Sequence, residues 1–482
     1  MTHWQGRAPA VRDLPGLQNL DLPGLRDHPS ERALQPEGVR TARGKRGAGV
    51  GADRAAVPLR VLIIYAQPIF WSMGEGRGSA IFTLLPAAIA ARGHEVRMCL
   101  PEINPAAHHP SILEPEEYHG VHLHRFATDR GFVPNSALPM GRRLLNRVDC
   151  WTRFQRWSWR TASELAAAHP PDVILGMGHY EAPIARRLAR RLGVPNVTRL
   201  FGTALSLHLR SPLRFYANFP EIIAFRTPAD LVVLNDDGAN GEAVVRHLRL
   251  PHSRFIHLRN GVDYSIFRPG PPSEALRRRL GLRPGQTMLL TATRLAPEKK
   301  LERAIRVLRD LVQLGVDAVL VLPGDGTERV PLEETAREEG MSGRVLFPGP
   351  ILQHEMPDWY RTADILLSLL DRTNAANPVF EAMACGRLVA ALDAGTTRAV
   401  VKDGLTGIVL RRDELHLLAP ALRDLLRDPS RRRRMEEAAA RAIPDLVMDL
   451  DDRLAREVEL IEGVAQAAAA RNGRPGAEQP AA

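Results

Sequence analysis

The sequence predicts an α/β protein with two doubly wound parallel sheets, each in a Rossmann-like domain. Short apolar runs of strand length alternate with amphipathic stretches of helix length along most of the chain. A Gly- and Pro-rich linker between Leu258 and Gln286 interrupts this alternation. The chain has 482 residues, and 44% of them are hydrophobic, which is enough for two domains with a core each.

Composition sets the expected domain limits. Residues 1–56 are basic, rich in Pro and Gly and without periodicity, so we expect a disordered extension. The amino-terminal domain is expected at 57–258 and the carboxyl-terminal domain at 259–445. A last helix is expected at 446–467, followed by a disordered tail at 468–482.

Composition also limits the class of protein and its location. No apolar run reaches the length that crosses a bilayer, and the first residues lack the apolar core of a signal peptide. Cys99, Cys150 and Cys385 are far apart and form no disulfide or metal pattern, so we expect a cytoplasmic protein. The net charge of +10 fits anionic substrates or an anionic membrane face equally well, and we expect no nucleic-acid partner.

The first βαβ unit carries a glycine-rich turn. A strand is expected at 59–66 and another at 95–100, with an amphipathic helix between them that ends near Gly93. Gly76 and Gly78 lie in the turn before this helix and let the backbone approach a ligand closely. The dinucleotide fingerprint would need Gly where Ser79 stands, so the turn gives an NAD site little support.

Three later strands of this domain each end at polar residues. The strands are expected at 172–176, 195–200 and 230–234. His179, Thr203 and Asn235 follow them, at the sheet edge where ligands bind in open α/β folds. His179 is a candidate catalytic residue, with a packed or capping histidine as the alternative. Thr203 and Asn235 are candidates for the acceptor side, and a helix cap near Ala239 is the alternative for the segment that begins at Asn235.

The second domain opens with a cationic loop. A buried strand is expected at 288–293, and Arg294 and Lys299 follow its carboxyl end. Arg offers a planar fork to phosphate oxygens and Lys a point charge, so this pair could hold a diphosphate from two sides. Lysine occurs only four times in this arginine-rich chain. The alternative is a solvated helix start with ordinary surface charge.

A helix start supplies the second part of this diphosphate site. Asn377 is expected to cap a helix whose first residue is Pro378, which leaves the amides as far as Val379 and Phe380 free to meet phosphate. One turn in, Glu381 could accept hydrogen bonds from two hydroxyl groups, as a ribose would offer. A buried and paired core glutamate is the alternative.

Together these motifs resemble the retaining glycosyltransferases of family four, which have the two-domain GT-B fold. The resemblance covers about four-fifths of the chain. Its matching pieces, in order, are Asn260-Gly261-Val262-Asp263, Arg294-Leu295 with Pro297-Glu298-Lys299, Gly324-Asp325-Gly326, Arg344 to Gly349, Ala363-Asp364, Glu381 to Gly386 and Asp403 to Gly407.

The resemblance implies roles for these residues. Arg294 and Lys299 would bind the donor diphosphate and stabilise it as it leaves, and Glu381 would bind the ribose. The two domains would face each other across a cleft, and the last helix would cross back to the first domain. The implied partners are a nucleotide-sugar donor and a sugar, lipid-linked or small-molecule acceptor, with no metal and no further cofactor.

The sequence departs from the family pattern at two positions. Thr373 stands where the family has a glutamate that touches the transferred sugar, and Asp371 is close enough in sequence to replace it after a loop shift. Phe201 occupies the place of a histidine that contacts the reacting sugar in many members, which makes His179 the better candidate.

Three further patterns have competing interpretations. Asp449-Leu450-Asp451 mimics the motif of metal-dependent transferases, but a solvated helix face is the favoured interpretation. His122 and His124 would share one strand face without further ligands, so a zinc site is disfavoured. Trp151, Phe154 and Ser158 share one face of a predicted helix, which either packs on the domain or contacts a membrane surface.

The sequence therefore predicts a metal-independent, retaining glycosyltransferase, cytoplasmic or peripheral at the inner face of the membrane. A nucleotide-sugar epimerase or phosphorylase of similar fold is the alternative among enzymes. A catalytically silent relative that binds a nucleotide or a glycan is the alternative from another class, because Thr373 and Phe201 depart from the family pattern.

Overall fold

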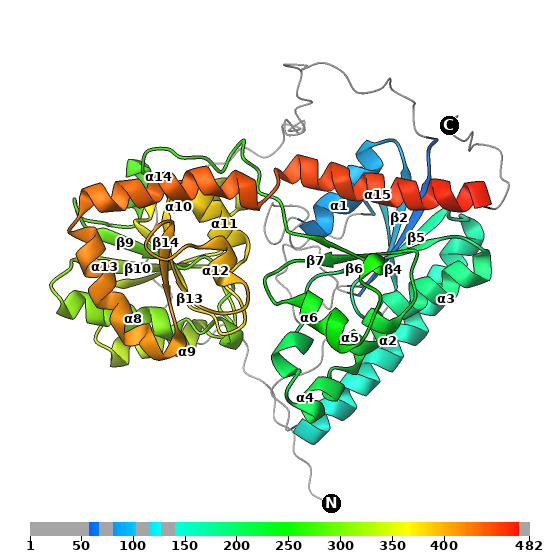
Figure 1. Cartoon of the computed structure of the whole chain (residues 1–482), viewed down its shortest axis with the longest axis horizontal. Coiled ribbons are helices and arrows are strands. Elements are labelled where there is room, and N and C mark those ends of the chain that lie inside the picture. Colours follow the sequence, from blue (N-terminus) through cyan, green and yellow to red (C-terminus); the bar gives the residue numbers. More distant parts are fainter. Residues whose placement is uncertain (1–56, 67–80, 103–115, 127–139, 472–482) are drawn as a thin grey trace, which may run out of the picture. The chain divides into compact units, whose positions relative to one another are not determined.

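The computed structural model describes residues 57–66, 81–102, 116–126 and 140–471, and contains two separate sheets (Figure 1). The expected extension at 1–56 lies outside the described residues. The first sheet has the strand order β3-β4-β2-β1-β5-β6-β7-β8 and is parallel except for the β3–β4 pair. Its strands are β1 (Arg60–Tyr65), β2 (Glu95–Pro101), β3 (Glu117–Tyr118), β4 (Val121–Phe126), β5 (Val173–Met177), β6 (Asn196–Leu200), β7 (Leu231–Asn235) and β8 (Phe255–Leu258).

The second sheet is parallel throughout, with the order β11-β10-β9-β12-β13-β14. Its strands are β9 (Thr287–Leu290), β10 (Ala318–Pro323), β11 (Val345–Gly349), β12 (Ile365–Ser368), β13 (Leu388–Leu392) and β14 (Gly407–Leu410). Nearly every residue of the central strands is buried, because helices cover both faces of a parallel sheet.

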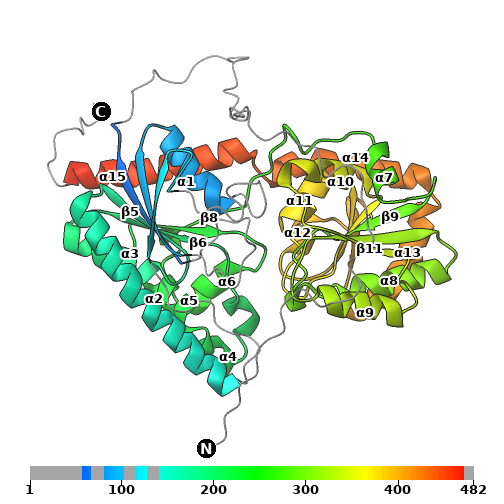
Figure 2. The same cartoon turned by 180° about the vertical axis from the view of Figure 1, so that it is seen from behind.

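Helices form the outer layers. The helices before the second sheet are α1 (Ile81–Ala91), α2 (Met140–Ala168), α3 (Ala182–Leu192), α4 (Pro212–Ala217), α5 (Phe219–Arg226), α6 (Gly241–His247) and α7 (Glu274–Arg279). Those after its first strand are α8 (Glu302–Gln313), α9 (Arg329–Glu338), α10 (Met356–Thr362), α11 (Asn377–Ala384), α12 (Thr397–Val400), α13 (Leu418–Leu426), α14 (Pro429–Leu446) and α15 (Leu450–Arg471). α1 and α15 cover one face of the first sheet, and α2, α3, α5 and α6 cover the other (Figures 1 and 2).

The strand orders decide which loops come together. In the second sheet the order reverses between β9 and β12, and in the first sheet it reverses between β1 and β5. Connections leave in opposite directions at such a point, which opens a crevice at the carboxyl edge of the sheet. The loops after β9 and β12, and the loop after β5, therefore lie where a ligand would bind.

Two expected boundaries need correction. The strand expected at 288–293 is shorter, since regular pairing ends at Leu290 and the backbone then turns into the cationic loop. The last helix begins at Leu450 and continues to Arg471, so residues expected in the tail are helical. Ala465 and Ala468 are buried, which explains why the helix extends past the predicted end.

Helix α15 is part of the hydrophobic core on the first sheet. Leu454, Val458 and Ile461 pack with residues of β1, β2 and β5. Beside them Glu457 accepts a hydrogen bond of 2.6 Å from Arg199 of β6 and pairs with Arg453, and all three side chains are almost fully buried. Burial alone would raise the pKa of Glu457, but the two guanidinium groups lower it below its ordinary value.

Loss of the Glu457 carboxylate should destabilise the protein strongly. Glu457→Gln leaves two buried guanidinium groups without a counter-charge, and we expect a loss of about 3–5 kcal/mol in the free energy of unfolding. Urea unfolding followed by circular dichroism measures this loss. Glu459→Gln is the control on the same helix, because that side chain is half exposed, and it should cost less than about 0.5 kcal/mol. Equal, small losses in both variants would contradict the assignment.

Candidate functional site

The loop after β9 presents a group of cations at the carboxyl edge of the second sheet. Arg294 is exposed, and its Nη2 lies 3.2 Å from a carboxylate oxygen of Glu298. Lys299 ends the short 3-10 helix η4 (Pro297–Lys299) and is half-buried. Burial lowers the pKa of Lys299, and the nearby Arg294 and Arg372 lower it further, while Glu298 raises it. Arg294 and Arg372, the latter from the loop after β12, therefore lie within electrostatic reach of Lys299.

A glycine turn after β10 fixes the backbone of this loop. Gly324 has a φ of +123°, and a side chain there would meet the carbonyl oxygen of Thr293 at 2.6 Å. A side chain on Gly326 would overlap the carbonyl oxygen of Leu295. The Leu295 amide donates to the Asp325 carbonyl, and the Glu328 amide donates to the Leu295 carbonyl. Only glycine permits this close approach, so the turn sets the position from which Arg294 projects.

Asn374 organises the loop between β12 and α11, a role that sequence reasoning missed. Its Oδ1 accepts hydrogen bonds from Ser368 Oγ at 2.8 Å and from the Leu370 amide at 3.0 Å. Its Nδ2 donates to the carbonyls of Leu370 and Leu392, and its own amide donates to Thr397. A fully buried asparagine with every group satisfied holds the segment that leads to the helix start.

The start of α11 differs from the prediction. The N-cap is Ala376, and no side chain caps the helix. Asn377 is the first helical residue, and its Oδ1 accepts a hydrogen bond from Asn260. The amides of Val379 and Phe380 donate to the Ala376 carbonyl, and Pro378 has no N–H. Several free amides were predicted at this helix start. Among the described residues, only one of these amides, that of Asn377, has no acceptor.

Glu381 is buried and already paired. Its Oε2 accepts a hydrogen bond of 2.7 Å from the Tyr360 hydroxyl, and its Oε1 accepts one of 3.2 Å from Gln353. Burial raises the pKa of Glu381, and these two hydrogen bonds act in the opposite direction. The structure thus agrees with the alternative of a paired core glutamate. Each carboxylate oxygen keeps a further lone pair, so ribose binding stays a prediction.

The structure leaves neither Asp371 nor Thr373 as a replacement for the missing family glutamate. Both Asp371 oxygens face Arg303, at 2.8 and 3.0 Å, and Arg303 also donates to the Leu369 carbonyl. Thr373 is buried and accepts a hydrogen bond from the Ala375 amide. A side chain on Gly238 would overlap the Thr373 hydroxyl, so this threonine occupies a tightly packed place.

In the first sheet, His179 and Thr203 follow the carboxyl ends of neighbouring strands, β5 and β6. The His179 ring stacks on Phe225 with 6.5 Å between ring centroids, and its buried Nε2 has no partner among the described residues. A ligand role for His179 therefore stays a prediction. The Thr203 hydroxyl is engaged instead, since it donates to Glu221 at 2.6 Å and accepts from the Leu205 amide.

The segment after β7 contains several polar side chains. Asn235 is buried, and its Oδ1 has no donor within the part of the chain that the structure describes. Asp237 pairs with Arg372 at 3.2 Å and accepts from the Ala239 amide. The following helix is capped by Asn240 and begins at Gly241, so the predicted cap near Ala239 is displaced. Gly76 and Gly78 lie outside the described residues.

Glu181 is a further residue that sequence reasoning missed. It lies just before α3 but makes no capping bond; instead its Oε1 accepts a hydrogen bond of 2.6 Å from the Ala66 amide, where β1 ends. A side chain on Gly178 would overlap the Glu181 carboxylate. Burial raises the pKa of Glu181 to about 8, because only backbone hydrogen bonds oppose it. A buried carboxyl group with a raised pKa therefore joins the ends of β1 and β5.

The remaining sequence patterns have structural roles. Asp449 accepts hydrogen bonds from the amides of Tyr264 and Asp451 at the start of α15. His122 lies 3.9 Å from Glu117, and His124 contacts Arg97. Phe154 and Ser158 are buried, so this face of α2 packs on the domain and makes no membrane surface. Among the described residues, no three His, Cys, Asp or Glu side chains converge as metal ligands would.

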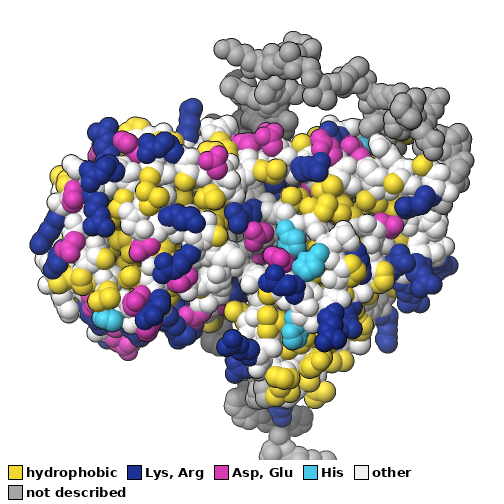
Figure 3. Space-filling model, viewed as in Figure 1, with side chains coloured by type: hydrophobic (Ala, Val, Ile, Leu, Met, Phe, Trp, Pro, Cys, Tyr) yellow, Lys and Arg dark blue, Asp and Glu magenta, His cyan; other side chains and the backbone are white. Residues whose placement is uncertain are grey.

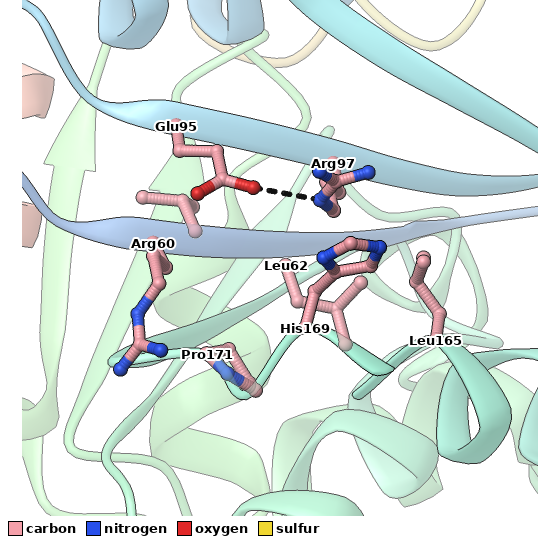
Figure 4. Close-up of a pocket in the computed structure, with 8 residues that line it drawn as sticks. Arg60, Leu62, Glu95, Arg97, Leu165, His169 and Pro171 are labelled. Carbon is pink, nitrogen blue, oxygen red and sulfur yellow. Dashed lines mark hydrogen bonds and ion pairs between the residues drawn. The ribbon is translucent and has the colours of Figure 1, made fainter. Parts of the chain in front are cut away.

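Two pockets in the described residues lie away from the loops of the candidate site. One, of about 10 Å³, is at the amino edge of the first sheet, where Arg97 pairs with Glu95 at 2.8 Å (Figure 4). It holds one water molecule at most. The other, of about 540 Å³, is lined by Gly386, Arg387 and residues of α14, past the carboxyl end of α11. Neither pocket contains a strand-end residue of the candidate site.

Comparison with known proteins identifies the class. Residues 272–442 match the family described as glycosyl transferases group 1, and residues 79–238 match a glycosyl transferase 4-like domain. A GDP-mannose-dependent α-(1-6)-phosphatidylinositol monomannoside mannosyltransferase of Mycolicibacterium smegmatis is 30% identical over 329 residues, which cover 61% of this chain and 83% of the relative. A D-inositol 3-phosphate glycosyltransferase of Frankia alni is 32% identical over 292 residues, or 57% of this chain and 70% of the relative.

Solved structures show the same architecture. Sucrose-phosphate synthase from Thermosynechococcus elongatus superposes with a TM-score of 0.66 at 16% identity, over 85% of this chain and all of the other. The Anabaena protein HepE in complex with UDP-glucose gives 0.61 at 18% identity, over 84% of this chain and all of the other. The protein is a glycosyltransferase with the GT-B fold. It belongs to the group 1 glycosyltransferases, of the family-four type.

Glu181, with its raised pKa, should make stability depend on pH. Its folded pKa lies above its ordinary value of 4.5, so its contribution is full below about pH 4.5 and is lost as pH rises towards about 8. Across this window the unfolded chain releases a proton that the folded chain keeps, at a cost of at most about 1.4 kcal/mol per pH unit. Glu181→Gln should remove that slope.

Urea midpoints of wild type and Glu181→Gln at a series of pH values from mildly acidic to mildly basic measure this difference. We expect the two curves to diverge as pH rises, with the variant relatively more stable at the basic end. Parallel curves over the whole range would show that Glu181 titrates normally in the folded protein.

Proposed function

We propose that this glycosyltransferase transfers a sugar from a nucleoside-diphosphate sugar to an acceptor hydroxyl, with retention of configuration and without a metal. The observation that carries the proposal is the group of three cations, Arg294, Lys299 and Arg372, at the point where the strand order of the second sheet reverses. Burial lowers the pKa of Lys299, the two guanidinium groups lower it further, and an anion bound beside them would relieve the repulsion between the cations. The diphosphate of the donor fits this requirement.

The same residues would act on the departing diphosphate. As the glycosidic bond breaks, negative charge develops on the phosphate oxygen that leaves. Arg294 and Lys299 would stabilise that charge from a loop whose backbone the glycine turn already fixes. The Asn377 amide at the start of α11 would add a backbone donor. These groups supply the charge compensation that a divalent metal gives in metal-dependent transferases.

The nucleoside and acceptor sides involve residues that the structure holds in place. Glu381, oriented by Tyr360 and Gln353, would accept hydrogen bonds from the ribose hydroxyls. His179 Nε2 would meet the sugar or the acceptor hydroxyl, and Asn235 Oδ1 would accept a hydrogen bond from the acceptor. Retention of configuration follows from the resemblance to family four. Thr203 is bonded to Glu221 and would act by positioning its loop.

Among acceptors, we favour one held at a membrane. The mannosyltransferase relative is named for a phosphatidylinositol mannoside, which is a lipid. Other relatives are named for a soluble inositol phosphate, so a small-molecule acceptor is the second candidate. A lipid-linked acceptor would place the reaction at the cytoplasmic face of a membrane. No helix in the described residues is long and apolar enough to cross one.

Removal of the Lys299 ammonium should weaken donor binding. We expect Lys299→Ala to weaken binding of the matching nucleotide sugar at least about tenfold, because it loses a charge-assisted hydrogen bond to the diphosphate. A thermal-shift screen against UDP-, GDP- and ADP-sugars measures this, since a bound ligand raises the melting temperature. Lys402→Ala is the control, because its ammonium donates to the Arg398 carbonyl of α12 and is not part of the candidate site. Equal shifts in both variants would refute the assigned site.

A further inference from the structure

We propose that a hydrophobic and basic surface on the first domain docks this enzyme on an anionic membrane. The docking surface consists of Leu144, Leu145 and Val148 at the amino-terminal end of α2, Leu207 in the 3-10 helix η2 (Leu205–His208), and Leu213 and Tyr216 in α4. This proposal rests on the proposed function, because docking on a membrane would bring the enzyme to a lipid-linked acceptor.

Exposed hydrophobic side chains concentrate on this surface. Six of the eleven large hydrophobic residues that are exposed in the described chain belong to it, whereas the other five are scattered over separate elements. Leu145, Leu213 and Tyr216 are 71%, 64% and 69% exposed. Large apolar side chains gathered on one surface mark an interaction site, while single ones do not.

The two parts of the surface are held together. Arg147 Nη1 of α2 donates to the Ala217 carbonyl at 2.6 Å and to Asn218 Oδ1 at 2.8 Å, both at the end of α4. The rings of Trp151 and Phe219 pack edge to face beside this contact. Figure 3 shows hydrophobic side chains gathered over α4 and the adjoining end of α2, with arginine side chains around them. The surface is thus one continuous feature of the folded domain.

Its charge favours an anionic partner. Arg142, Arg143, Arg210 and Arg214 are exposed around the hydrophobic side chains. Within the described residues, Arg142, Arg210 and Arg214 form no ion pair, unlike exposed arginines such as Arg160 and Arg433. Asp149, an acidic neighbour, pairs with Arg153. Apolar side chains ringed by unpaired arginines fit the interface of a bilayer that contains anionic lipids.

The same charge argues against a second copy of the chain. A twofold interface would bring each surface against its own copy, and the arginines of the two rims would face each other. Like charges across an interface oppose association, whereas phosphate groups of lipids would neutralise them. An anionic membrane is therefore the occupant that the surface fits best.

The position of the surface agrees with a membrane-held acceptor. Helix α2 ends at Ala168 and leads by a short connection into the amino end of β5, so its other end lies towards the carboxyl edge of the first sheet. Helix η2 begins at Leu205, two residues after Thr203 and shortly after the end of β6. The docking surface and the candidate acceptor residues His179 and Thr203 therefore lie at the same edge of the sheet.

Vesicle co-sedimentation of the full chain tests the proposal. The vesicles contain either phosphatidylcholine alone or phosphatidylcholine mixed with phosphatidylglycerol. The apolar variant is Leu145→Gln with Tyr216→Gln, and the charge variant is Arg142→Gln with Arg214→Gln. Val330→Gln with Leu405→Gln and Arg433→Gln with Arg441→Gln are matched controls, because these side chains are similarly exposed on the second domain. All proteins keep residues 1–56, so any contribution from that extension is constant.

We expect wild type to bind the mixed vesicles and the controls to bind equally well. The apolar and charge variants should each bind at least about tenfold more weakly, and the charge variant should also respond less to salt. Absence of wild-type binding, or unchanged binding in both variants, would overturn the proposal. A dimer seen by sedimentation and lost in the apolar variant would assign the surface to a second copy instead. The nucleotide-sugar thermal shift is measured on the same proteins. A variant that keeps this shift but no longer binds vesicles has lost docking alone, whereas absence of the shift in wild type would count against the donor site.

Discussion

The candidate site depends on one electrostatic constraint: three cations are held close together at the carboxyl edge of the second sheet. Lys299 and Arg294 come from the loop after β9, and Arg372 comes from the loop after β12. The reversal of strand order makes these loops neighbours, and the glycine turn after β10 fixes the first of them through its backbone. Glu298 and Asp237 offset only part of the charge. A group of cations of this kind favours binding of a polyvalent anion. In a glycosyltransferase of this family, we expect that anion to be the diphosphate of the donor.

Several buried polar groups around this site hold loops in place. Asn374 bonds to five neighbouring groups and sets the segment before α11, and Glu181 joins the ends of β1 and β5. The buried group of Arg199, Arg453 and Glu457 ties the last helix to β6 of the first sheet. Removing one partner leaves the others buried and unpaired, which destabilises the fold.

Much of the fold could be predicted from sequence because parallel strands are buried on both faces and therefore appear as short apolar runs. The cationic loop was also predictable, since its two cations lie on one short segment after a strand. The helix expected to begin at Pro378 was nearly right, but its cap was not: Asn377 and Ala376 are adjacent, and only the backbone shows which one precedes the first helical turn. Arg372, Asn374 and Glu181 were missed because their roles depend on partners far away in sequence, such as Ala66 for Glu181. By sequence position Asp371 could replace the family carboxylate, and its pairing with Arg303, across 68 residues, is likewise not visible in sequence.

The most direct test of the central claim is the titration of Lys299 itself. The chain contains only four lysines, so isotope-labelled lysine side chains give few NMR signals, and Lys299→Arg assigns the one of interest. The account predicts that Lys299 titrates below its ordinary pKa of 10.5 in the free protein, and that this pKa rises when a nucleoside diphosphate binds, since the anion relieves the repulsion from Arg294 and Arg372. An ordinary pKa that no nucleoside diphosphate changes would contradict it.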